Sequence, residues 1–174
     1  MYYFPRIFWI YFINEELEYE GEFRYNRKWN GKGYDESGNI IYELINGNGK
    51  VKEYYYNDIL KFEGEYLNGK ANGKGKEYYD NGILKYEGDY LNNKKWNGKG
   101  YDENGNIIYE LINGNGKVKE YNYDGKLLFE GEYLNGKKHG KGKEYNGNGR
   151  LEYEGEFLND KRNGDEKNIT LIKN

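Results

Sequence analysis

The sequence contains no cysteine and only one residue each of histidine, proline, alanine, serine and threonine. The absence of cysteine excludes disulfide bonds, thiolate metal sites and a cysteine nucleophile, and it leaves the redox state of the compartment open. A Ser–His–acid triad would have to use Ser37 and His139, which lie in predicted turns of different repeats. We therefore expect no catalytic residue, no metal site and no cofactor.

The charge and the aromatic content together indicate a folded protein. One third of the residues (33%) are charged, but the net charge is only −3, and 18% of the residues are aromatic, including 22 tyrosines. A disordered chain typically combines few aromatic residues with a high net charge. The slightly acidic balance also argues against nucleic acid as the main partner.

An apolar run, Met1–Ile13, begins the sequence. It lacks the positive n-region and the small-residue cleavage site of a signal peptide, and it is shorter than the roughly 20 residues that a membrane-spanning helix needs. Residues 9–19 share a pattern with residues 76–86, so we interpret residues 1–18 as a degenerate half-repeat that caps the N-terminal end. A targeting or membrane role for this run is the alternative.

Internal repeats dominate the rest of the chain. The string Tyr-Glu-Gly-(Glu/Asp)-(Phe/Tyr) begins at Tyr19, Tyr86 and Tyr153, a spacing of 67 residues, and residues 19–85 match residues 86–152 at 50 of 67 positions. Such identity indicates a tandem duplication. The repeats span residues 19–164, with units that begin at positions 19, 42, 62, 86, 109, 129 and 153. Residues 165–174 depart from the pattern and are predicted to be a tail or a second cap.

Strict alternation within each unit predicts β-strands. In Leu84–Tyr90, the apolar residues and glycine occupy every second position, and Lys85, Glu87 and Asp89 occupy the others. Asn-Gly and Asp-Gly pairs favour the positive φ angles of hairpin turns. We predict turns at 68–73, 135–140, 80–82 and 122–125. The expected fold is all-β: an elongated, single-layer, twisted antiparallel meander of stacked β-hairpins, like a solenoid.

Two segments carry a resemblance to a known family. Phe62–Gly75 reads Phe-Glu-Gly-Glu-Tyr-Leu-Asn-Gly-Lys-Ala-Asn-Gly-Lys-Gly, and Phe129–Gly142 matches it almost throughout. This pattern resembles the MORN repeat, and residues 77–85 resemble a bacterial variant that is sometimes described as antitoxin-like. The resemblance implies a twisted sheet with an aromatic-lined groove that serves as a scaffold or interaction module, and some members are proposed to bind phospholipid. Leu44 and Leu111 replace a glycine of the pattern, so their grooves should be partly filled.

The aromatic and glycine positions of the repeats are the candidate partner-binding site. A glycine with an aromatic residue two positions away on either side leaves a slot on the pleated face, which a ring can cover. These positions either pack the fold or form a groove for a partner peptide, and both roles can hold. The candidate groove residues are Tyr19, Gly21, Phe23, Phe62, Gly64, Tyr66, Tyr86, Gly88, Tyr90, Phe129, Gly131, Tyr133, Tyr153, Gly155 and Phe157.

Paired carboxylates such as Glu63/Glu65 and Glu130/Glu132 could suggest glycosidase chemistry. They recur in every unit, whereas an active site is normally unique, so we interpret them as cross-strand ion pairs with lysines such as Lys61, Lys76 and Lys85. Residues 34–39 and 101–106 faintly resemble calcium loops but lack the terminal glutamate, and they are predicted to be turns.

The expected function is a non-enzymatic scaffold or protein-interaction module that binds a partner along the aromatic–glycine groove or at a terminal edge strand, where an edge-to-edge dimer could also form. A peripheral phospholipid-binding module is the first alternative, with Lys94-Lys95 and Lys137-Lys138-His139 at the headgroups. An antitoxin-like protein that neutralises a cognate toxin is the second. The default location is cytoplasmic, with membrane association as the alternative.

Overall fold

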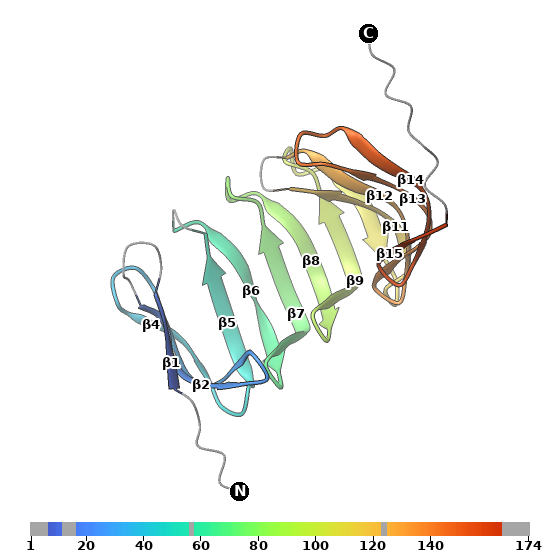
Figure 1. Ribbon diagram of the computed structural model, residues 1–174. Helices are drawn as coiled ribbons and strands as arrows, with labels where there is room; N and C mark the ends of the chain where they lie inside the picture. The colour runs from blue at the N-terminus through green and yellow to red at the C-terminus, as the bar shows by residue number, and fades with distance from the viewer. Residues whose placement is uncertain (1–6, 12–16, 56–57, 123–124, 165–174) are drawn as a thin grey trace, which may run out of the picture. The chain divides into compact units, whose positions relative to one another are not determined.

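The computed structural model describes residues 7–11, 17–55, 58–122 and 125–164 (Figure 1). Most of the predicted N-terminal cap and the whole of the predicted C-terminal tail or cap, residues 165–174, therefore lie outside the described residues. The described part of the N-terminal run forms one strand, which pairs antiparallel with the first strand of the repeats.

The described residues contain no helix and form antiparallel strands in chain order, which confirms the predicted all-β hairpin meander. The strands are β1 (Ile7–Tyr11), β2 (Leu17–Arg24), β3 (Arg27–Tyr34), β4 (Ile40–Leu44), β5 (Gly49–Tyr54), β6 (Leu60–Leu67), β7 (Lys70–Tyr78), β8 (Leu84–Leu91), β9 (Lys94–Tyr101), β10 (Ile107–Leu111), β11 (Gly116–Tyr121), β12 (Leu127–Leu134), β13 (Lys137–Tyr145), β14 (Leu151–Leu158) and β15 (Lys161–Asn163). They belong to three sheets, β1–β4, β5–β10 and β11–β15, each in sequence order.

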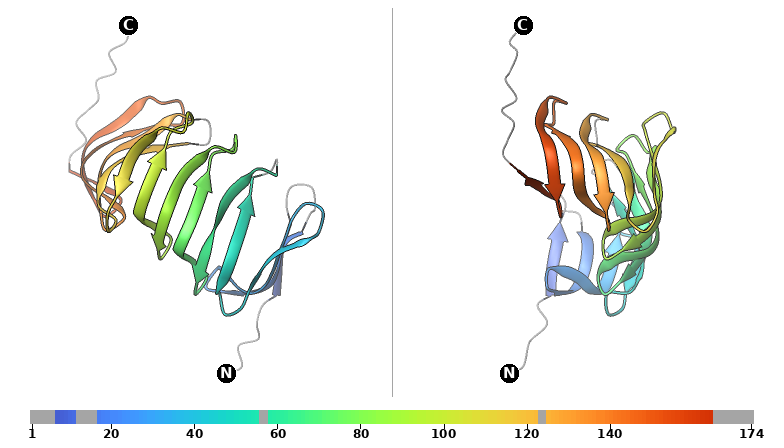
Figure 2. Two further views of the ribbon diagram at one scale, coloured as in Figure 1. Left: turned by 180° about the vertical axis from the view of Figure 1, so that it is seen from behind. Right: turned by 90° about the vertical axis from the view of Figure 1, so that its right-hand side faces the viewer.

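The chain divides into two compact units. Unit 1 comprises the described residues up to 82 together with residues 89–93, and unit 2 comprises residues 83–88 together with the described residues from 94 onwards. Within unit 2, β12, β13 and β14 lie side by side, as Figure 2 shows in orange. Within unit 1, β5, β6 and β7 are paired in the same way.

The core of each unit consists mainly of tyrosine, phenylalanine and a few aliphatic side chains from one face of the strands. In unit 1, Tyr19, Tyr42, Leu44 and Val51 form one buried cluster. In unit 2, Phe129, Tyr153 and Phe157 form another. A thin sheet can bury such large rings because the rings lie over glycines. A Cβ atom at Gly142 would lie only 2.8 Å from the Phe129 ring.

Two of the hairpin turns, predicted at 68–73 and 135–140, are shorter than the sequence predicted, whereas residues 80–82 form a turn as predicted. In each of the two shorter turns, only two residues form the turn. Asn68 and Gly69 have left-handed φ angles of 53° and 71°, and Asn135 and Gly136 have φ angles of 53° and 69°. Residues 70–73 and 137–140 already belong to β7 and β13. The two-residue turn with two positive φ angles matches the twist of the flanking strands.

A bulge accounts for the extra residues after each of these turns. Gly73 and Gly140 have φ angles of 107° and 64°, which lets the strand continue past unpaired residues. His139 therefore lies in β13 and not in a turn, so its predicted placement was wrong. Ser37 does lie in a turn.

Candidate functional site

The side of the sheet that carries the candidate groove residues is called the aromatic face. Most of its rings are buried against one another. Phe62 lies edge-on to Tyr90 at 5.4 Å between ring centroids, and Phe129 lies edge-on to Phe157 at 5.2 Å. Buried rings of the candidate set are Tyr19, Phe62, Tyr86, Tyr90, Phe129, Tyr153 and Phe157. Phe23, Tyr66 and Tyr133 remain partly exposed, as do the five glycines, so a partner would reach few rings directly.

Leu44 and Leu111, which replace a glycine of the pattern, are both buried. The Leu44 Cδ2 atom lies 3.1 Å from the position that a Cβ atom of Gly49 would occupy, and Leu111 stands in the same relation to Gly116 at 3.2 Å. The leucine side chains thus fill the slot that glycine leaves open in the other units.

Basic side chains cover the aromatic face, although the alternating pattern alone does not predict them there. Lys28 of β3 lies over the rings of Tyr19 and Tyr42, at 5.3 and 5.7 Å from their centroids. Its ammonium group donates hydrogen bonds to Glu18 (2.8 Å) and to the Tyr42 hydroxyl (3.0 Å). Burial alone would lower the pKa of Lys28, but the neighbouring oxygens of Tyr42 and Glu18 raise it above its ordinary value. Lys28 thus stays charged over the rings.

Unit 2 repeats this arrangement with a larger ion-pair network. The Lys138 ammonium lies 4.3 Å from the Phe129 centroid and pairs with Glu144 at 3.2 Å, and Arg162 pairs with the same carboxylate at 2.8 Å. Burial acts to raise the pKa of Glu144, but hydrogen bonds from Arg162 and Lys138 outweigh it and lower the pKa. Lys95 lies over the Tyr86 ring at 4.9 Å.

A positional signal for these covering residues exists in the sequence. Each is the second basic residue after a turn, as in Asn135-Gly136-Lys137-Lys138 and Asp160-Lys161-Arg162. Alternation then places the second basic residue on the face opposite to the first. The unit that begins at Phe62 has Ala71 at this position, and Ala71 is buried there.

The opposite side of the sheet is called the charged face, and it carries lysine and glutamate in alternating columns. In unit 2, β11 and β13 contribute lysines and β12 and β14 contribute glutamates. Lys143 stands opposite Glu130 and Glu154 in the register, and its ammonium lies 3.9 and 3.8 Å from their carboxylates. The Glu130/Glu132 pair thus belongs to a repeated cross-strand pattern. Opposite charges at this spacing each contribute a few tenths of a kcal/mol to about 1 kcal/mol.

The same pattern occurs in unit 1. Glu63 stands opposite Lys52 and Lys76, so the predicted neighbour Lys76 is correct. Lys61 lies instead over the Tyr55 ring, 5.8 Å from its centroid. The Tyr78 hydroxyl also donates a hydrogen bond to Glu63 at 3.0 Å.

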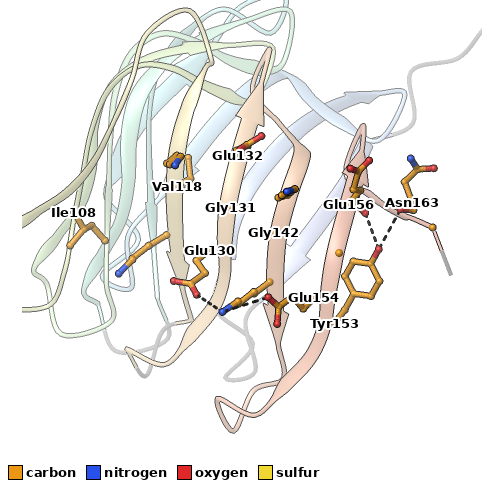
Figure 3. A pocket seen from close by; sticks show the side chains of 16 residues that line it. Ile108, Val118, Glu130, Gly131, Glu132, Gly142, Tyr153, Glu154, Glu156 and Asn163 are labelled. Carbon is orange, nitrogen blue, oxygen red and sulfur yellow. Dashed lines mark hydrogen bonds and ion pairs between the residues drawn. The ribbon is translucent and has the colours of Figure 1, made fainter. Parts of the chain in front are cut away.

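A hollow of about 1210 Å³ opens on the charged face of unit 2 (Figure 3). Gly131, Gly142 and Gly155 stand opposite one another across β12, β13 and β14 in the middle of it. A Cβ atom at Gly131 or Gly142 would project toward the Phe129 ring on the aromatic face, so only the backbone of these residues borders the hollow. The glutamates and lysines on either side border the row, and Figure 3 shows Glu130, Glu132, Glu154 and Glu156 among them.

The loops that resemble calcium sites are turns. Asp35 accepts hydrogen bonds from the backbone N–H and the side-chain amide of Asn39, at 2.8 and 3.1 Å, and these bonds hold the pKa of Asp35 below its ordinary value. Among the described residues, no group of three or more histidine, aspartate or glutamate side chains could hold a metal ion. The described part of the chain also has no helix long and apolar enough to cross a membrane.

Comparison with protein families identifies two kinds of repeat. The model of the MORN repeat matches residues 62–83, 129–149 and 153–164. The model of the MORN repeat variant matches residues 47–68 and 114–135. No curated protein matches the chain. The variant matches begin just after Leu44 and Leu111, where a leucine fills the glycine slot.

Proposed function

Because the chain belongs to the MORN-repeat family, whose repeats are generally modules for interaction with proteins or lipids, we propose that it is a non-enzymatic scaffold that binds a protein partner. The hollow over the glycine row of unit 2 is the observation that carries this proposal. Its volume of about 1210 Å³ exceeds the range of roughly 300–1,000 Å³ that is usual for small-molecule pockets. A charged, open hollow of this size suits a segment of polypeptide.

This proposal changes which part of the candidate groove contacts the partner. Gly131 and Gly155 border the hollow, and Tyr133 is partly exposed. The rings of Phe129 and Phe157 are buried and covered by Lys138. The partner therefore contacts glycine backbone and the flanking charged side chains, while the buried rings hold the sheet in shape.

The lipid alternative receives less support from the contacts. It relied on Lys94-Lys95 and Lys137-Lys138, but the ammonium groups of Lys95 and Lys138 lie over aromatic rings. Lys94 donates a hydrogen bond to the Asn135 carbonyl at 3.4 Å. A cognate toxin, as the antitoxin-like hypothesis requires, would be one example of a protein partner.

A charge-swapped variant tests the proposal while it keeps one positive and one negative side chain at a cross-strand pair. Lys117→Glu combined with Glu132→Lys inverts one cross-strand pair at the border of the hollow. The duplicated block supplies the matched control, because Lys50→Glu with Glu65→Lys makes the same swap in unit 1. The full-length chain and both variants are immobilised, and bound proteins from the source cells are identified by mass spectrometry.

We expect the unit 2 swap to lose a specific protein that the wild type and the unit 1 swap both retain. Thermal melting checks that the two variants are equally stable, because each keeps a pair of opposite charges but Glu65→Lys also removes the carboxylate that accepts the Lys74 N–H at 3.0 Å. Equal capture by both variants, or capture of no specific protein by any of them, would contradict the proposed site.

A further inference from the structure

Exposed aliphatic side chains stand at the same place in successive hairpins, immediately before each Asn turn. In unit 2 they are Ile112, Leu134 and Leu158, which are 65%, 43% and 45% exposed. Ile45, Leu67 and Leu91 occupy the equivalent positions of unit 1 and are exposed as well. Single exposed aliphatic residues are ordinary on protein surfaces, but a series at one position of six hairpins is a regular feature of the fold.

A lysine stands directly across from two of these residues in unit 2. Leu134 pairs with Lys137 and Leu158 pairs with Lys161, as the last cross-strand pair of each hairpin. Residues paired in this way project to the same side of the sheet. Leu134 also shares a side with Glu130 and Glu132 by alternation. We call Ile112, Leu134, Leu158, Lys137 and Lys161 the tip row, which lies at the turn end of the charged face.

The tip row is held in fixed order by hydrogen bonds between turns. The Gly136 N–H donates to the Gly114 carbonyl at 2.8 Å, and the Asp160 N–H donates to the Lys138 carbonyl at 3.1 Å. The Asn135 N–H further donates to the Asn115 side chain at 2.9 Å. Turns tied together in this way present their side chains with little loss of entropy on binding.

The two basic residues after each turn have different environments. Lys138 and Arg162 are engaged with acidic side chains on the aromatic face. Lys137 and Lys161, on the other face, have no acidic side chain within ion-pair distance among the described residues. Asp160 directly precedes Lys161, and its carboxylate accepts a hydrogen bond from the Lys138 N–H at 2.8 Å.

Acidic residues lie one step further from the turns, and each has a lysine opposite. Glu132 stands across from Lys117, and Glu156 stands across from Lys141. The tip row thus combines aliphatic side chains with lysines that lack an acidic partner in the described part of the chain, on a protein whose net charge is −3. A partner that covers this row has to supply carboxylates.

The spacing of the tip row fits one kind of secondary structure. Aliphatic residues recur every two strands, about 10 Å apart, and each lysine lies about 5 Å from its leucine. Seven residues of an α-helix rise about 10.5 Å, and three or four residues rise about 5 Å. We propose that the tip row of unit 2 binds an acidic amphipathic helix of a partner protein, with apolar residues at every seventh position and carboxylates three or four positions after each.

The proposal deepens the proposed function, since it rests on the protein being a binding module and gives the chemistry of a partner. A second copy of this chain does not suit the surface, because its own tip row would bring lysine against lysine. The helix buries its apolar residues against the aliphatic side chains of the tip row. Its carboxylates pair with Lys137 and Lys161 at the rim of the contact, where charged pairs mainly determine which partner binds.

A labelled peptide of about three heptads provides the probe, with leucine at the first position of each heptad and glutamate three and four positions later. Binding to the full-length chain is followed by fluorescence anisotropy at low salt. All proteins carry Leu67→Gln and Lys70→Glu, which remove an equivalent leucine–lysine pair of unit 1. A peptide of the same composition in scrambled order, and a peptide with lysine in place of glutamate, are the peptide controls.

We expect Lys137→Glu combined with Lys161→Glu to weaken binding of the acidic peptide about tenfold or more and to gain binding of the lysine peptide. Leu134→Gln combined with Leu158→Gln should weaken the binding of both the acidic peptide and the lysine peptide. The swap of Lys117 and Glu132 should leave peptide affinity unchanged. Unchanged affinity in the lysine variant, or equal binding of the scrambled peptide, would overturn the proposal.

Vesicles of phosphatidylserine distinguish a lipid surface from a helix. If the protein binds the vesicles but not the acidic peptide, and the tip-row variants lose vesicle binding, the ligand of the tip row is an anionic membrane and not a helix. The capture experiment separates the two sites. If capture of the cellular partner depends on the hollow but not on the tip row, the tip-row proposal is wrong and the proposed function is unaffected. If capture depends on the tip row but not on the hollow, the partner-binding site is the tip row and not the hollow.

Discussion

The Lys138 ammonium group lies 4.3 Å from the centroid of the fully buried Phe129 ring. The lysine comes from β13 and the phenylalanine from β12, where Tyr133 rather than Phe129 stands opposite Lys138 in the register. The centroid of the Phe157 ring lies 6.0 Å from the same Lys138 nitrogen. The lysine stem therefore lies along the aromatic face and covers rings of two hairpins. Long basic side chains, whose stems are apolar and whose ends stay at the surface, thus close the core on the aromatic face.

Replacing this lysine should destabilise the fold although it is a charged residue. Lys138→Ala removes a partly desolvated cation–π contact and the ion pair to Glu144, so we expect unfolding to become easier by about 1–2 kcal/mol. Lys137→Ala is the matched control, because Lys137 has no such contact among the described residues, and it should change stability by less than about 0.5 kcal/mol. Urea unfolding followed by tyrosine fluorescence measures both. Equal effects would show that Lys138 contributes nothing to the core.

Glycines that lie under the rings should tolerate no side chain. A Cβ atom at Gly142 would lie 2.8 Å from the Phe129 ring and 3.2 Å from the Phe157 ring, so Gly142→Ala should cost about 1–3 kcal/mol through overpacking. Gly147 has open space around its Cβ position, and Gly147→Ala should be neutral or slightly stabilising. Thermal melting of the two variants distinguishes this steric requirement from a general effect of losing a glycine.

The alternating pattern of the repeats was sufficient to predict the strands and their two faces. Leu84, Tyr86 and Tyr90 fall on one side of β8, and both tyrosines are buried as the pattern requires. Period-two alternation is a local property that a sequence displays directly. The turn lengths were less accessible, because Gly140 could be a turn residue or a bulge residue, and only the pairing of β12 with β13 decides between them.

The covering lysines could not be predicted from alternation alone. A lysine on the apolar side of a strand contradicts the simple pattern, and its favourable partners come from other strands. Lys138 meets Glu144 of its own strand but also Glu120 of β11, at 3.7 Å. The partner-binding role of the candidate groove remains a prediction, although the burial of seven of its ten rings limits the ways in which a partner could use them.

The hydrogen-bonded turns give a further prediction about local stability. Asn115 accepts the Asn135 N–H at 2.9 Å, and the duplicated block has the same bond from Asn68 to Asn48, also at 2.9 Å. Asn115→Ala should speed hydrogen exchange of the Asn135 amide and cost about 1 kcal/mol or less, because the site is exposed and water can replace the acceptor. The Asn68 amide serves as the internal reference. Unchanged exchange at Asn135 would mean that the backbone bonds alone hold the turns together.

Tyrosines that donate to glutamates should make stability fall at alkaline pH. The Tyr145 hydroxyl donates to Glu130 at 2.9 Å, and burial, together with this carboxylate, raises the pKa of Tyr145 from 10.0 to about 12. A raised folded pKa means that the neutral form is favoured in the native state. Its contribution is therefore complete below pH 10 and is lost as the pH rises from 10 to 12.

Tyr145→Phe should therefore reduce stability at pH 8 and flatten the decline between pH 10 and pH 12. Urea midpoints across this range give the slope directly, and phenylalanine keeps the ring and removes only the titrating hydroxyl. Tyr25→Phe is the control, because Tyr25 is 93% exposed. A decline that stays equally steep in Tyr145→Phe would assign the alkaline transition to other tyrosines. Tyr101 would then be the next candidate, since its hydroxyl donates to Glu87 at 2.7 Å and its pKa is also raised to about 12 by that bond.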